Sequence, residues 1–278
     1  MTSRKKNKQS RRSATAAARA DRQTLYEESV QNSEADVDFV EAEFRRFTGR
    51  RPRYLREDFC GTANTACAWV RRRKDNHAIG VDLDKDVLAW ARDHNLANLR
   101  KAQRARIELV EGDVTKVVSP PQDVVLAMNF SYWIFFERRT LRNYFRKVRA
   151  ALADGGVFFL DCFGGYDAYR VGPERQRRDG YTYVWDLASY NPVDARVKYH
   201  IHFRFDDGSR LDRAFTYDWR QWTLPEISEL LREAGFAKVT IYAQGWDEKE
   251  QDGDGVFKPV EEIDADAGWI CYLAAQRG

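Results

Sequence analysis

The sequence predicts an α/β protein whose parallel sheet carries helices on both faces, with a second, antiparallel sheet inserted late in the chain. Between residues 53 and 161, short apolar runs alternate with amphipathic stretches whose apolar residues recur every three or four positions. After residue 180, three β-like runs follow one another with no helical pattern between them. The first pattern is typical of successive βαβ units, and the second of antiparallel strands.

The first half of the chain predicts a helical segment and then five strands. Residues 21–47 carry apolar side chains at helical steps among charges, and the Gly- and Pro-containing residues 49–52 end this segment. The apolar runs that follow predict strands over 53–58, 78–83, 107–111, 123–128 and 156–161, interspersed with helices over 63–73, 85–95 and 137–152.

The second half predicts the insert and the end of the main sheet. The β-like runs cover 181–187, 196–205 and 210–219, and residues 206–209 join the last two as a hairpin. Thr223 and Glu226 form a capping box for a helix that stops at Gly235. Strands over 238–243 and 269–274, separated by an acidic loop rich in Gly and Asp, close the chain. We expect a doubly wound, seven-stranded Rossmann-like sheet with an antiparallel β cover and an N-terminal helical segment.

The net charge of +3 comes from the first 20 residues. They hold seven Lys or Arg and no acid, so 39 basic and 43 acidic side chains remain in the rest of the chain. We expect this polar tail to be disordered and solvated. A nucleic-acid-binding arm and an organelle transit segment are the alternatives. The mildly acidic remainder disfavours a polyanionic ligand.

The cysteines and apolar runs exclude several classes of protein. Cys60, Cys67, Cys162 and Cys271 lie apart with no CxxC pair, so we expect neither a disulfide framework nor a metal site. No apolar run is long enough to span a bilayer, and no apolar segment typical of a secretory signal follows the amino terminus. We therefore expect a cytoplasmic protein without a membrane partner. The sequence leaves the oligomeric state open.

The stretch REDFCGTANTA, residues 56–66, ends the first predicted strand and opens a helix. In open α/β sheets, ligands bind where strand ends meet helix N-termini, and Gly61, Thr62 and Ala63 are small enough for close approach there. A dinucleotide loop would read GxGxxG and hold a pyrophosphate on the helix dipole. Glu57 and Asp58 would repel a pyrophosphate. The acidic loop instead favours a cationic, amine-bearing ligand such as S-adenosylmethionine.

Two further strands end in acids. Asp82 ends the second strand, 25 residues after Glu57, where a carboxylate can bind both hydroxyls of a ribose. Asp113 follows the third strand, where it would lie near an adenine amino group. On these residues the sequence resembles the class I S-adenosylmethionine-dependent methyltransferases across about residues 53–163, and more loosely to the carboxyl terminus. The variant LREDFCGTA resembles a bacterial subgroup of that family.

The resemblance implies roles for individual residues. Glu57, Gly61 and Ala63 align with the acidic and glycine-rich motif of the family, although Phe59 and Ala63 replace glycines. The segment after the fourth strand would line the transfer site, and Tyr26 would close over the cofactor. The cofactor-binding residues implied in this way are Tyr26, Arg56, Glu57, Phe59, Gly61, Thr62, Ala63, Asp82, Leu83, Asp113, Val114, Asn129 and Ser131.

The resemblance also divides the chain into five parts. These are a disordered basic tail (1–20), an N-terminal helical cap (21–50), the S-adenosylmethionine-binding core (51–163), a β insert over the active site (164–222) and the completion of the core sheet (223–278). The insert resembles the antiparallel sheet that covers the active site of small-molecule N-methyltransferases.

The insert carries the catalytic candidates. His200 and His202 lie two residues apart in a strand and therefore share a face. We expect this face to look inward, with a His as proton acceptor and Tyr132 on the opposite wall. The alternative is a solvent-facing polar face. The aromatic run 215–222 could form a cage for a cationic acceptor, although ordinary sheet packing is the favoured interpretation.

These observations favour a methyltransferase that acts on a small molecule, above all an amine. An RNA methyltransferase that uses the basic tail is one alternative, which makes nucleic acid an unlikely but possible partner. A non-catalytic S-adenosylmethionine-binding protein is another, because Phe59 stands where the family has a glycine. A nicotinamide-dependent oxidoreductase ranks last, since the glycine fingerprint is missing.

Overall fold

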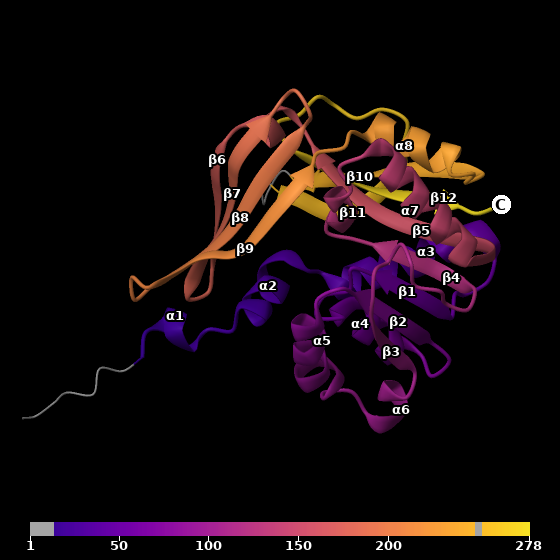
Figure 1. Cartoon of the computed structure of the whole chain (residues 1–278), viewed down its shortest axis with the longest axis horizontal. Coiled ribbons are helices and arrows are strands. Elements are labelled where there is room, and N and C mark those ends of the chain that lie inside the picture. Colours follow the sequence, from indigo (N-terminus) through magenta and orange to yellow (C-terminus); the bar gives the residue numbers. More distant parts are fainter. Residues whose placement is uncertain (1–13, 248–251) are drawn as a thin grey trace, which may run out of the picture.

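The computed structural model describes residues 14–247 and 252–278, which form two sheets (Figure 1). An eight-stranded sheet forms the core, and a four-stranded antiparallel sheet, here called the cover, leans over one end of it. This arrangement confirms the Rossmann-like α/β fold with an inserted β cover. No helix in these two ranges is long and apolar enough to cross a membrane.

Five parallel strands make up most of the core sheet, and all of them overlap the predicted runs. They are β1 (Tyr54–Asp58), β2 (His77–Asp82), β3 (Ile107–Glu111), β4 (Gln122–Ala127) and β5 (Leu152–Gly164). Three antiparallel strands extend the sheet beyond β5, in the order β12 (Trp269–Gln276), β10 (Lys238–Asp247) and β11 (Asp252–Val260). The strand order reverses between β1 and β4. Ligands of open α/β sheets bind at such a switch point.

Helices cover both faces of the core sheet. On one face α3 (Ser33–Thr48), α4 (Asn64–Arg72) and α5 (Lys85–Ala91) bury one apolar cluster, and on the other α7 (Arg138–Ala151) and α8 (Leu224–Glu233) bury a second. The predicted capping box opens α8, because the Thr223 hydroxyl accepts from the Glu226 amide. The predicted helix over 85–95 continues from α5 as a π-helix, η1 (Arg92–Leu96). A short helix, α6 (Lys101–Arg104), precedes β3.

The cover consists of β6 (Gly172–Arg178), β7 (Tyr181–Asn191), β8 (Arg196–Phe205) and β9 (Arg210–Arg220), paired in that order. The predicted hairpin joins β8 to β9. A short helix, η3 (Tyr166–Tyr169), leads from β5 toward β6. At the other edge, β9 meets the core beside η2 (Ser131–Ile134), where the rings of Trp219 and Trp133 lie 6.0 Å apart.

The N-terminal arm corrects the expectation of a disordered tail for residues 16–19. These residues form α1 (Ala16–Arg19), which lies at the β8–β9 hairpin (Figure 1). There Asp207 Oδ2 accepts from the amide of Ala16, and Ser209 Oγ accepts from that of Ala17. The helix is ordered because the hairpin satisfies amides that a helix N-terminus leaves unpaired. Residues 1–13 of the predicted tail lie outside the described residues.

Three other elements differ from the prediction. The helical stretch over 21–47 is two helices, α2 (Arg22–Val30) and α3, separated at Gln31 and Asn32. Strand β6 was not predicted, and β11 occupies part of the expected acidic loop. The core sheet therefore has eight strands rather than seven, and the cover has four rather than three.

Candidate active site

The loop after β1 has an unusual backbone. Phe59, Gly61 and Ala63 have φ angles of 58°, 50° and 56°, all in the left-handed region. This region favours glycine, because a Cβ there meets the following carbonyl oxygen. Phe59 and Ala63 therefore adopt a backbone conformation that glycine adopts more readily.

Glu57 anchors the helix that follows this loop. Its Oε2 accepts from the amide of Ala66 at 2.9 Å, in the first turn of α4. The side chain is buried, and burial raises the pKa of the carboxyl group to about 8. Glu57 therefore lies beneath the loop as a support, on the α4 side of the sheet.

Asp82 joins the loop to the end of β2. Its Oδ2 accepts from the Gly61 amide at 2.8 Å, and its Oδ1 accepts from the Asp84 amide at 2.9 Å. Partial burial raises the pKa of this carboxyl group. The next residue, Leu83, is 72% exposed. An exposed apolar side chain beside a strand-end carboxylate fits a ligand that presents an aromatic base next to a ribose.

The loop has room and polar capacity for a ligand. A Cβ built on Gly61 would meet no atom within 4 Å, so the space above this residue is open. The Thr62 hydroxyl is buried, and in the described structure it has no hydrogen-bond partner. Open space over a left-handed glycine, an unsatisfied buried hydroxyl and exposed Leu83 together fit S-adenosylmethionine.

The Arg56 side chain, predicted to contact the cofactor, is engaged inside the protein. Its side chain is buried on the α7 side of the sheet, where its Nε lies 2.6 Å from Asp58 Oδ1. Its Nη2 donates to the Val114 carbonyl, and the Tyr144 hydroxyl donates to Asp58. Arg56 and Asp58 face the same way because they are two residues apart in a strand. The pair also means that Asp58 contributes no free negative charge to the loop.

The end of β3 fits the prediction in part. Asp113 is partly exposed, and the Thr115 hydroxyl donates to its Oδ1 at 2.6 Å. This hydrogen bond and nearby Lys116 lower the pKa of the Asp113 carboxyl group. The Val114 side chain is buried in the apolar core. A ligand can therefore reach the Asp113 carboxylate, but not the side chain of Val114.

A second strained turn follows β4. Asn129 and Phe130 both have φ angles of 57°. Buried Asp161, in the second half of β5, holds the turn, because its carboxylate accepts from the Asn129 and Phe130 amides at 2.7 and 2.8 Å. Burial raises the pKa of Asp161 to about 7. The sequence analysis missed this residue, although an acid that ends a buried apolar strand was the available signal.

Two predicted residues of this turn have structural partners. The Ser131 hydroxyl donates to the Met128 carbonyl at 2.8 Å. The Tyr132 hydroxyl donates to the Asp161 carbonyl at 2.6 Å, and its ring is fully buried. Burial raises the pKa of Tyr132 well above its usual value. Tyr132 is therefore a core residue, which contradicts its prediction as catalytic.

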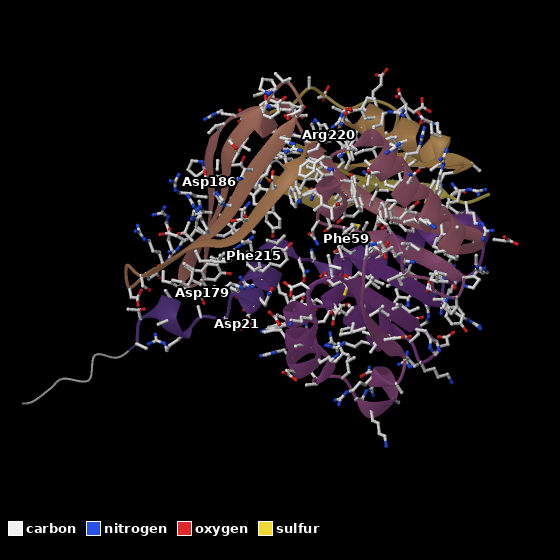
Figure 2. All side chains as sticks on the ribbon, viewed as in Figure 1. Asp21, Phe59, Asp179, Asp186, Phe215 and Arg220 are labelled. Atoms are coloured by element: carbon white, nitrogen blue, oxygen red, sulfur yellow. The ribbon has the colours of Figure 1, made fainter. Side chains whose placement is uncertain are left out.

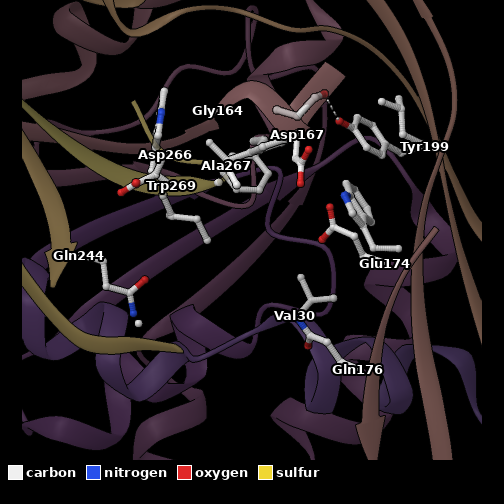
Figure 3. Close-up of a pocket in the computed structure, with 18 of the residues that line it drawn as sticks. Val30, Gly164, Asp167, Glu174, Gln176, Tyr199, Gln244, Asp266, Ala267 and Trp269 are labelled. Atoms are coloured by element: carbon white, nitrogen blue, oxygen red, sulfur yellow. Dashed lines mark hydrogen bonds between the residues drawn. The ribbon is translucent and has the colours of Figure 1, made fainter. Parts of the chain in front are cut away.

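A large cavity lies between this turn and the cover (Figure 3). Its volume is about 820 Å³, and Asn129 and Phe130 form part of its wall. Aromatic side chains supply much of the lining, and its charged residues within 14–247 and 252–278 are four acids and one arginine. The aromatic residues are Tyr26, Phe130, Phe163, Tyr183, Trp185, Tyr199, Tyr217, Trp219, Trp246 and Trp269, and the charged ones are Asp167, Arg170, Glu174, Asp264 and Asp266.

Helix α2 lies between the cavity and the cofactor loop. Tyr26 lines the cavity, and its ring lies 5.0 Å from that of Phe215 in the cover. Glu27, the next residue, accepts from Asn95, whose side-chain amide also donates to the Thr62 carbonyl at 3.0 Å. Helix α2 therefore lines the cavity and is linked to the loop through Asn95.

His200 and His202 face away from the cavity, which corrects the prediction. Tyr199 and Ile201, at the alternate positions of β8, line the cavity instead. His200 pairs with Thr216 at 2.9 Å, and His202 lies 3.5 Å from Asp186. Figure 2 shows Asp186 on the outer side of the cover and Phe215 on the side toward α2. The polar residues of β8 form its outer face, and the apolar residues that alternate with them form its inner face.

The comparisons with known proteins agree with this geometry. Residues 60–158 match the model of a methyltransferase domain family. A solved S-adenosylmethionine-dependent methyltransferase from Clostridium acetobutylicum is similar, with a TM-score of 0.66 and 19% identity over 92% of this chain and 98% of that one. No curated protein sequence matches the chain.

Two further solved structures are similar. One is CalS10, an amino pentose methyltransferase from Micromonospora echinaspora involved in calicheamicin biosynthesis (TM-score 0.65, 17% identity, 92% of this chain and 96% of that one). The other is DesVI from Streptomyces venezuelae (TM-score 0.64, 16% identity, 91% and 95%). At such identities the likeness shows the fold. The matched domain and the fold together support a methyltransferase that uses S-adenosylmethionine.

Proposed function

We propose that the protein transfers a methyl group from S-adenosylmethionine to a small-molecule amine. The observation that carries this proposal is the cavity between the β4 turn and the cover. Among the described residues, its charged lining is four carboxylates against one arginine, and ten aromatic side chains also line it. Acids and aromatic faces both attract cationic amines, and they disfavour anionic acceptors.

The residues of the loop side would hold the cofactor. The open backbone over Gly61 and the Thr62 hydroxyl would contact its amino-acid part, Asp82 its ribose hydroxyls, and Leu83 and Asp113 its adenine. When bound, S-adenosylmethionine supplies an electrophilic methyl group on a sulfonium. The carboxylate of Asp82 beside the loop suits a cationic ligand.

The residues of the cavity side would prepare the acceptor. An amine must lose its proton before it can attack a methyl group, and carboxylates such as Asp167 can attract the ammonium form and take up its proton. Tyr26 and Trp219 line the cavity and would exclude water. Much of the acceleration would come from orientation, since holding two reactants in attack geometry removes a large entropic barrier.

The names of similar proteins support the acceptor class. One similar structure is described as an amino pentose methyltransferase and another as the sugar N-methyltransferase KedS8. Both act on nitrogen-bearing small molecules by name. The carboxylate-rich cavity of this chain gives the same acceptor class an independent physical reason.

A transfer assay tests the proposal. The purified protein is incubated with methyl-labelled S-adenosylmethionine and an amine-rich metabolite extract, and labelled products are identified by mass spectrometry. We expect label in a cation that grows by one methyl group. Label found in RNA and absent from every small molecule would contradict the proposal. Absence of S-adenosylhomocysteine release with every fraction would refute the enzymatic assignment itself.

A further inference from the structure

Glu174 stands out among the charged residues of the cavity. It lies on β6, the edge strand of the cover, and with Gly172 and Gln176 it faces inward. Asp167 already has a cationic neighbour, because Arg170 lies 3.2 Å from it. Within the described ranges, the Glu174 carboxylate makes neither a hydrogen bond nor an ion pair. Figure 3 shows the carboxylates of both Asp167 and Glu174 turned into the cavity.

The surroundings of Glu174 suit an organic cation. Trp185 is its direct partner across the β6–β7 ladder, so both side chains project from the same face. The Trp185 ring stacks on Tyr199 at 4.4 Å with an interplanar angle of 15°. A carboxylate beside the faces of electron-rich rings is a favourable environment for an ammonium group.

This environment lies far from where methyl transfer would occur. The β4 turn, with Asn129 and Phe130, meets the cover at β9, where the rings of Phe130 and Trp219 are 6.5 Å apart. Strand β6 is the opposite edge of the cover, three strands away from β9. Neighbouring strands are ~4.8 Å apart, so Glu174 lies on the order of 14 Å from the β9 edge. The nitrogen that is methylated cannot occupy both places.

We propose that Glu174 and Trp185 form a subsite for a second cationic group of the acceptor, which makes the acceptor an extended diamine or polyamine-like molecule. One amine reaches the β4 turn as the neutral nucleophile, and the ammonium at the far end pairs with Glu174 over the Trp185 ring. This inference rests on the proposed function and specifies its substrate class. The ion pair with Glu174 selects acceptors of a particular length, because the molecule must extend from β6 to the β4 turn.

The test compares chain-matched probes that differ in their second charge. Hexamethylenediamine, octamethylenediamine and spermidine are titrated against hexylamine and octylamine. Calorimetry is used, with the full chain saturated with S-adenosylhomocysteine so that no turnover occurs. The substitution Glu174→Gln keeps the size of the side chain and removes its charge. Asp186→Asn, on the outer face of the same sheet, is the matched control. Thermal melting confirms that all three proteins are folded.

We expect at least one of the longer di- or polyamines to bind about tenfold to hundredfold more tightly than the monoamine of equal length. Glu174→Gln should remove this advantage and leave monoamine affinity unchanged, whereas Asp186→Asn should preserve it. Equal affinities for diamines and monoamines in the unaltered protein would overturn the subsite. If a monoamine is nevertheless methylated by the enzyme, the proposed function stands without the subsite. If no amine binds and no amine is methylated, both proposals fail.

Discussion

Asp82 on β2 and Gly61 in the loop after β1 are joined by a hydrogen bond of 2.8 Å from the Gly61 amide to Asp82 Oδ2. The same carboxylate also accepts from the Asp84 amide. Asp82 thus fixes the position of the loop and still presents its charge at the strand end. In the proposed cofactor site, loop shape and ribose recognition would both depend on the Asp82 side chain.

Asp82→Ala should therefore weaken binding of S-adenosylmethionine by roughly 1.5–3 kcal/mol, as for the loss of hydrogen bonds to a charged group. Calorimetry with S-adenosylmethionine and its demethylated product measures the change. Asp154→Asn is the control, since the Asp154 side chain is 95% exposed on the far side of β5. Unchanged affinity in the Asp82 variant would assign the ribose to another residue.

The left-handed backbone at Ala63 predicts an unusual order of stabilities. The free energy of unfolding of Ala63→Gly should lie within about 0.5 kcal/mol of that of the unaltered protein. Relief of the left-handed strain offsets the lost methyl group and the added freedom of the unfolded chain. Ala63→Val should cost at least about 2 kcal/mol, since a β-branched residue fits neither the conformation nor the fully buried site. Urea unfolding measures both variants.

Ala66→Gly supplies the comparison for this pair, because Ala66 lies inside α4 and is also fully buried. Glycine there should cost about 1 kcal/mol or more from helix propensity and lost packing. Equal losses for glycine at 63 and at 66 would show that the conformation of Ala63 carries no strain.

The raised pKa of Glu57 predicts a stability that falls with rising pH. The folded protein holds the Glu57 proton up to a pKa of about 8, whereas the unfolded chain releases it near pH 4.5. Between these values the native state binds more protons, so the free energy of unfolding decreases as pH rises. Glu57→Gln should match the unaltered protein near pH 5 and be more stable at pH 8 to 9, on the order of 2–4 kcal/mol.

Urea unfolding at several pH values measures this effect. The Gln side chain can still accept from the Ala66 amide, so the helix keeps its cap. Asp154→Asn should leave the pH profile unchanged, because its side chain is solvent-exposed. A Glu57→Gln variant that is less stable than the unaltered protein at pH 8 would mean that the ionised carboxylate is well accommodated in the fold.

The outward orientation of His200 and His202 predicts that their replacement has little effect on catalysis. His200→Ala and His202→Ala should leave turnover of the acceptor within about twofold of the unaltered enzyme, because general-base loss alone would cost a factor of about 10² or more. Tyr199→Ala, one position away and facing the cavity, should raise the KM for the acceptor. Steady-state kinetics with an identified acceptor measures all three. A hundredfold loss in either His variant would contradict the orientation.

Deletion of residues 1–13 tests the alternative that RNA is the acceptor. The deletion keeps α1 and its contacts with Asp207 and Ser209. Turnover of an amine acceptor should be unchanged and should depend only weakly on salt. Activity that is lost on deletion and falls steeply with added salt would indicate phosphate contacts by the tail.

The sequence predicted the core sheet well because its strands are continuous apolar runs between amphipathic helices. Strand β6 escaped prediction because Gly172–Arg178 carries no apolar residue: it lies at a sheet edge, largely exposed, and no hydrophobic pattern marks it. Arg56 was included among the cofactor-binding residues through the family resemblance, and the structure places its side chain in a buried ion pair with Asp58. Asp58, two residues on and on the same face, was the signal of an internal pair.

The orientation of the cover was open to a simpler interpretation. Val197, Tyr199, Ile201 and Phe203 alternate with the polar residues of β8, and the apolar side of a strand faces the interior. The prediction instead placed the face that carries the two histidines toward the interior. The cavity itself could not be predicted, because its lining comes from segments far apart in the chain, such as α2, η3, β6 and the loop before β12.

The contacts of α2 have a consequence for the order of events in a catalytic cycle. Asp21 accepts from Trp90 and Glu27 from Asn95 on the core side, while Ser29 pairs with Tyr181 of the cover. Helix α2 is therefore hydrogen-bonded both to the core and to the cover. A movement of α2 that lets a nucleoside pass must break hydrogen bonds to the core and to the cover at the same time. The spent cofactor and the product would then leave through the same opening. If this opening is slow, it is the rate-limiting step of turnover, and the rate of methyl transfer itself does not affect kcat.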